Sequence, residues 1–72
     1  VLRNDVDDEA AELLVRHDLG LTMARLGELE EARRVLEEVL AEAPRVFGAE
    51  SEQTLGFEEN LIEIDIATLE HT

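Results

Sequence analysis

Apolar residues recur every three or four positions along three stretches of this chain, and that spacing limits what the chain can fold into. Side chains spaced in this way share one face of an α-helix, whereas a half-buried strand needs strict alternation. The spacing is interrupted at Gly27 and again between Pro44 and Gly48. The sequence therefore predicts an all-α fold with three helices, at about residues 7–26, 28–43 and 52–70.

Glycine and proline divide the first two helices. Gly27 fits the left-handed residue that commonly ends a helix. Pro44 disfavours a helical conformation at Ala43, so the second helix should end there, or kink and continue for one more turn until Gly48 stops it. Gly20 lies inside the first helix, where glycine costs about 1 kcal/mol relative to alanine. Such a glycine indicates that a neighbouring helix approaches closely.

The third helix carries two apolar stripes and begins with a cap at either Ser51 or Glu50. Two stripes are more than one neighbouring helix can cover, so the helix is packed on both sides or lacks an outer partner. One hypothesis is that its surplus apolar face closes a homodimer. The residues of this candidate association face are Leu55, Phe57, Leu61, Ile62, Ile66 and Leu69.

Length and charge restrict the class of protein. Seventy-two residues make one small domain or a piece of a larger array, with residues 1–6 as a flexible N-terminal segment and residues 7–70 as a single helical domain. The formal net charge of −13 argues against nucleic acid and anionic membranes, and a charged partner should be basic. Cysteine is absent, as is any apolar run of membrane-spanning length, so we expect a cytoplasmic protein.

No pattern of residues indicates catalysis, a cofactor or a metal site. The many glutamate pairs suit a solvated helix surface and need no cleft. His17 and Asp18 are adjacent and point about 100° apart on a helix, which is poor geometry for a proton relay. Acidic residues alternate over positions 5–9 as in a calcium loop, but Ala10 and Arg16 stand where that loop needs Gly and Glu.

Residues 13–44 resemble a tetratricopeptide repeat, because small and large residues occur at the spacing of that family. The residues that carry the resemblance are Leu19, Gly20, Met23, Gly27, Ala32, Leu36 and Pro44, whereas Arg16 and Val39 depart from it. Leu13 and Leu55 lie 42 positions apart, and the intervening VFGAESEQTL is similar to the connector of the long kinesin-light-chain type. In the second copy Ile62 takes the place of Gly20. The chain thus holds about one and a half repeats, so we expect flanking repeats or self-association.

The resemblance implies a non-catalytic scaffold that binds a protein or peptide in a groove lined by the first helix of each repeat. Glu59 and Glu63 would make this groove acidic and favour a basic partner. The alternative is a self-associating structural domain that serves dimerisation or docking in a larger protein. The residues that the resemblance places in the groove are Leu14, His17, Asp18, Leu21, Arg25, Glu59, Asn60 and Glu63.

Overall fold

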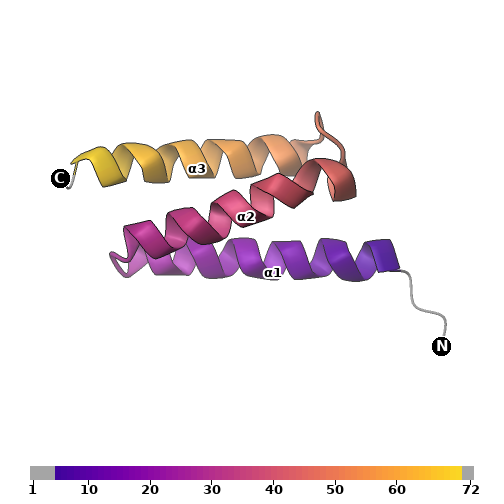
Figure 1. Cartoon of the computed structure of the whole chain (residues 1–72), viewed down its shortest axis with the longest axis horizontal. Helices are drawn as coiled ribbons and strands as arrows, with labels where there is room; N and C mark the ends of the chain where they lie inside the picture. The colour runs from indigo at the N-terminus through magenta and orange to yellow at the C-terminus, as the bar shows by residue number, and fades with distance from the viewer. Residues whose placement is uncertain (1–4, 71–72) are drawn as a thin grey trace.

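Three helices lie side by side in alternating directions, as Figure 1 shows for the computed structural model, which describes residues 5–70. They are α1 (Asp5–Arg25), α2 (Leu29–Phe47) and α3 (Glu52–Glu70). The predicted all-α class is confirmed, and residues 5–70 contain no strand. Helix α1 begins two residues earlier than predicted, so the segment with alternating acids is its first turn and not a loop. The first four residues of the predicted flexible segment lie outside the described part of the chain.

Helix α1 ends in a tight turn built on Gly27. Its backbone φ of +86° lies in the left-handed region that favours glycine. The N–H of Glu28 donates to the carbonyl of Met23 at 2.9 Å, and the N–H of Gly27 donates to that of Ala24 at 3.0 Å. This pair of bonds is the Schellman motif, which satisfies carbonyls at the helix end. The predicted role of Gly27 is therefore confirmed.

Helices α1 and α2 approach closely at Gly20. A Cβ atom on Gly20 would stand 2.8 Å from Cδ2 of Leu36 and 3.4 Å from Cγ1 of Val35. Leu36 is itself almost completely buried, so it has little room to move away. The absence of a side chain at position 20 lets the two helices pack at this distance, as the sequence predicted.

Helix α2 continues past Pro44 to Phe47, so its predicted end at Ala43 is wrong and the alternative of one further turn is right. Proline removes only its own N–H, and its carbonyl still accepts from the N–H of Gly48 at 2.9 Å. Val46 and Phe47 pack against buried core residues. Their burial favours the extra turn over the local penalty of the proline.

The start of α3 is fixed by hydrogen bonds from Ser51 and Thr54, a group of contacts called the Ser51–Thr54 clasp below. The N–H of Thr54 donates to Oγ of Ser51 at 3.2 Å, which identifies Ser51, and not Glu50, as the cap. Oγ1 of Thr54 donates to the carbonyl of Gly48 at 2.7 Å, and Oγ of Ser51 donates to the same carbonyl at 3.0 Å. Hydrogen bonds thus fix the connection between α2 and α3 at both of its ends.

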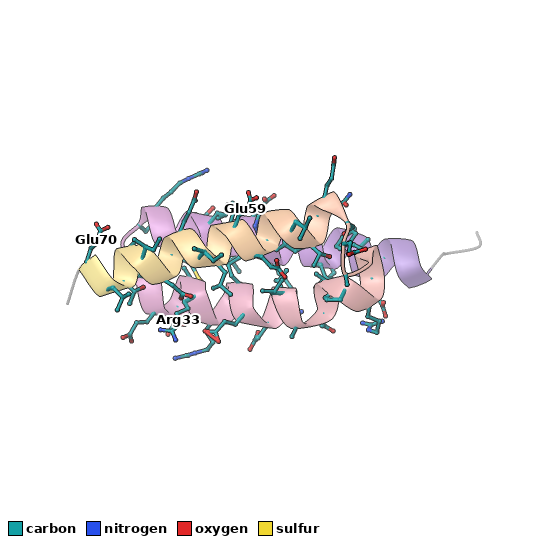
Figure 2. The ribbon with its side chains drawn as sticks, turned by 90° about the horizontal axis from the view of Figure 1, so that it is seen from above. Arg33, Glu59 and Glu70 are labelled. Atoms are coloured by element: carbon teal, nitrogen blue, oxygen red, sulfur yellow. The ribbon has the colours of Figure 1, made fainter. Side chains whose placement is uncertain are left out.

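The core is a strip along α2 that is covered from two sides. Its most buried residues are Ala32, Leu36, Val39 and Ala43, each at most 1% exposed. Helix α1 contributes Leu13 to this core, and α3 contributes Phe57 and Ile64. Figure 2, seen from above, shows α3 lying over the other two helices.

Charged side chains cross between α1 and α2 at the edge of the core. The guanidinium of Arg16 lies 3.2 Å from the carboxylate of Glu38 and 3.3 Å from that of Glu42. Arg45 in turn pairs with Glu9 at 2.9 Å. Exposed pairs of this kind contribute at most about 1 kcal/mol each, so apolar burial dominates the stability of the hairpin.

Two helix-interior glycines provide a matched test of the close approach. Gly20→Ala gains about 1 kcal/mol of helix propensity but incurs about 1–3 kcal/mol of over-packing. Its free energy of unfolding should therefore fall, by up to about 2 kcal/mol. Gly56, inside α3, would place a Cβ in open space, so Gly56→Ala should raise the free energy of unfolding by about 1 kcal/mol. Urea denaturation of both variants measures the difference. A gain in stability for both would contradict the packing role of Gly20.

Candidate functional site

The eight residues of the predicted groove belong to α1 and α3, and the surface that carries them is called the α1–α3 face below. Two of them contact each other directly. Nδ2 of Asn60 on α3 lies 2.9 Å from Nε2 of His17 on α1. Because an amide nitrogen only donates, Nε2 accepts, and the imidazole carries its proton on Nδ1. This hydrogen bond joins the two helices that form the face.

His17 is part of the interior. Its side chain is 9% exposed, and its ring stacks on Phe57 with centroids 4.4 Å apart. Phe47 contacts Phe57 edge-on, with the two ring centroids 5.9 Å apart. Burial lowers the pKa of His17 from 6.5, and the neighbouring carboxylate of Asp18 opposes this shift only in part. His17 therefore remains neutral near pH 7 and serves as a packed hydrogen-bond acceptor.

The other six residues of the face are more accessible. Leu21 is half-buried and packs on the core. The exposed residues are Leu14, Asp18 and Arg25 on α1 and Glu59 and Glu63 on α3. A ligand on this face would therefore meet an apolar side chain and several charges, while the imidazole of His17 is already occupied.

Charge is distributed unevenly over the three helices. Helix α3 carries six acidic residues and no basic one. The arginines with ion pairs belong to α1 and α2, and they include Arg16, Arg33 and Arg45. Figure 2 shows Glu59 at the edge of α3 nearer α1 and Arg33 on the opposite side, where it approaches Asp65 at 3.3 Å. No ion pair within the described residues includes Glu59 or Glu63. The α1–α3 face therefore carries two exposed carboxylates, Glu59 and Glu63, without a described ion pair, together with Asp18 and Arg25.

The six residues of the candidate association face divide into two groups. Phe57 is buried and Leu61 packs against the core, so neither lies on an exposed face. The other four project from the outer side of α3 and form what we call the outer stripe. They are Leu55, Ile62, Ile66 and Leu69, with exposed fractions of 45%, 57%, 51% and 74%.

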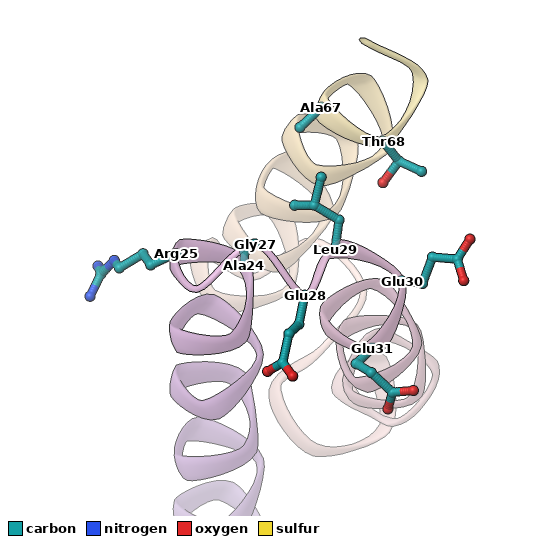
Figure 3. A pocket seen from close by; sticks show the side chains of 9 residues that line it. All are labelled: Ala24, Arg25, Gly27, Glu28, Leu29, Glu30, Glu31, Ala67 and Thr68. Atoms are coloured by element: carbon teal, nitrogen blue, oxygen red, sulfur yellow. The ribbon is translucent and has the colours of Figure 1, made fainter. Parts of the chain in front are cut away.

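An open depression lies where the α1–α2 turn meets the last turns of α3. Figure 3 shows the nine residues that line it, which are Ala24, Arg25, Gly27, Glu28, Leu29, Glu30, Glu31, Ala67 and Thr68. Glu30 and Glu31 belong to the first turn of α2 and Glu28 precedes it as the N-cap residue, so the helix dipole stabilises their carboxylates. Because the depression arises from a turn meeting a distant helix, no local sequence pattern marks it.

The described side chains include no group of three or more His, Asp or Glu residues suited to holding a metal ion. None of the three helices within residues 5–70 is both long and apolar enough to cross a membrane. Comparisons of the chain with protein-family models, curated proteins and solved structures find no match. The fold thus defines a small all-α unit.

The buried imidazole predicts a pH dependence of stability. The pKa of His17 is lower in the folded chain than in the unfolded chain, where it is about 6.5, so the unfolded state binds more protons below that pH. The contribution of neutral His17 to the free energy of unfolding is therefore fully present above pH 6.5. It decreases as the pH falls towards the pKa of His17 in the folded chain. Denaturation of wild type and His17→Gln over this range measures it. The stability difference between the two proteins should shrink on acidification, and a constant difference would contradict the assignment.

Proposed function

We propose that residues 5–70 form a protein-interaction module, non-catalytic and similar to a tetratricopeptide repeat, that binds a basic protein segment across the α1–α3 face. The observation that carries the proposal is a pair of exposed carboxylates on this face, Glu59 and Glu63, which lie outside every described ion pair. Leu14 on α1 offers an exposed apolar contact on the same face. Lysine or arginine on a partner would be attracted by these carboxylates and held in register by the apolar side chain.

The likeness to a tetratricopeptide repeat is supported by the packing of the hairpin. The absence of a side chain at Gly20 lets α2 pack closely on α1, and Gly27 forms the turn between these helices. Ala32 is completely buried where they meet. These are the positions at which the sequence pattern matches that family. Helices α1 and α3 run in the same direction, as the first helices of two successive repeats would.

The charge of the α1–α3 face can be tested with Glu59→Gln/Glu63→Gln. Titration with short lysine- and arginine-rich peptides should show chemical-shift changes around Asn60 and Glu63 in wild type. The variant should bind about threefold or more weakly at low salt and show a smaller salt dependence, because exposed carboxylates act through screened attraction. Glu28→Gln/Glu30→Gln removes the same charge at the start of α2 and should leave affinity nearly unchanged. Equal losses in both variants would show that only net charge matters.

Self-association is a second candidate function, favoured by the exposed aliphatic side chains of the outer stripe. Mass measured by light scattering over a wide range of concentrations tests it. A dimer that is lost in Ile62→Asn/Ile66→Asn would support this candidate, whereas a monomer throughout would exclude it.

A further inference from the structure

We infer that the outer stripe of α3 docks an amphipathic helix from a partner protein, with a basic flank, and not a second copy of this chain. The inference rests on the proposed function for the basic character of the partner. It differs from the proposed function because it places the partner's apolar anchors on the outer stripe, a separate surface from which Leu55, Ile62, Ile66 and Leu69 project.

The spacing of the stripe suits a straight helix as its occupant. Its members stand at intervals of seven, four and three residues, which keeps them on one line along α3. From Leu55 to Leu69 this line extends for about 21 Å at the helical rise of 1.5 Å per residue. A helix of about four turns lying alongside would cover it, because helices pack by setting such ridges into one another's grooves.

The structure already contains a helix packed in this way on the matching side of α1. With the 42-residue offset between Leu13 and Leu55, Gly20 corresponds to Ile62 and Ala24 to Ile66. On α1 these positions face α2: Leu13 is buried, Gly20 contacts Leu36, and Ala24 packs on the same cluster. On α3 the corresponding positions are uncovered. Isoleucine in place of glycine means that the occupant lies farther out than α2 does from α1.

The charge on both flanks of the outer stripe favours a basic partner helix over a second copy of this chain. A rim of four exposed glutamates runs beside the stripe on the side towards the α1–α3 face, at Glu52, Glu59, Glu63 and Glu70. The other flank carries Glu58 and Asp65, and α3 has no basic residue. Two copies packed stripe to stripe, in either direction, would therefore set carboxylates against carboxylates. A helix with lysine or arginine beside its apolar anchors meets this surface with opposite charge.

The probe is a synthetic peptide of leucine and lysine with leucine at helical spacing, titrated calorimetrically into the whole chain. Its scrambled counterpart, and one with glutamate in place of lysine, should bind at least about tenfold more weakly. Ile62→Asn/Ile66→Asn should weaken binding of the leucine–lysine peptide about tenfold or more, since central apolar anchors dominate helix docking. Leu55→Asn/Leu69→Asn, at the ends of the stripe, is a second variant should the first one fold poorly.

Two control variants define the outcomes. Val15→Asn/Leu19→Asn changes two aliphatic residues of α1 that are 66% and 49% exposed, comparable to Ile62 and Ile66, and should leave affinity within about twofold. Leu14→Asn/Asp18→Asn alters the α1–α3 face, where the proposed function places a basic segment, and therefore reports how much of the peptide binds on that face instead of on the stripe. An equal loss in the Val15 control would show unspecific apolar adsorption and overturn the inference.

The remaining outcomes separate the inference from the proposed function. Loss of peptide binding only in the Leu14 variant would keep the α1–α3 face as the site and overturn docking on the stripe. Binding of extended basic peptides without binding of the helical leucine–lysine peptide would also keep the α1–α3 face as the site and overturn docking on the stripe. If neither kind of peptide binds, both proposals fail. A dimer that Ile62→Asn/Ile66→Asn dissociates would identify a second copy as the occupant and also overturn the inference.

Discussion

The structure depends on one helix being covered from two sides. The strip of α2 that includes Leu36 and Val39 is fully buried only because α1 lies against one side of it and α3 against the other. Gly20 sets the distance on the first side, and Phe57 and Ile64 fill the second. Since α2 takes up one face of each neighbour, no other helix within residues 5–70 covers the opposite faces of α1 and α3. The same arrangement that forms the core therefore creates the exposed aliphatic surfaces.

Much of this fold was predictable because its determinants are local. The periodicity of apolar residues located all three helices, and the bounds of α3 agree with the prediction to the residue. The turn at Gly27 and the cap at Ser51 depend on residue types within a few positions of each other. The end of α2 was missed because the penalty of Pro44 is local, whereas the burial of Val46 and Phe47 that outweighs it involves α1 and α3.

The surface was less predictable because it depends on contacts between distant positions. His17 and Asn60 are 43 positions apart, and no spacing rule indicates that one accepts a hydrogen bond from the other. The resemblance placed both in a groove without showing that they satisfy each other. Periodicity also identified two stripes on α3 but not which one is buried. Phe57 and Ile64 face inward because α2 presents a closely fitting surface there, a property of the assembled helices.

The Ser51–Thr54 clasp has a consequence for recognition. Because Gly48, Ser51 and Thr54 are joined by hydrogen bonds, α3 is held in its orientation before any partner arrives. A surface ordered in advance loses little conformational entropy on association, and most of that loss falls on the incoming segment. Among partners with the same anchors and charges, affinity will therefore follow their own tendency to be helical in solution. The rigidity of a four-residue connector, residues 48–51, thus makes the partner's folding the step that discriminates between ligands.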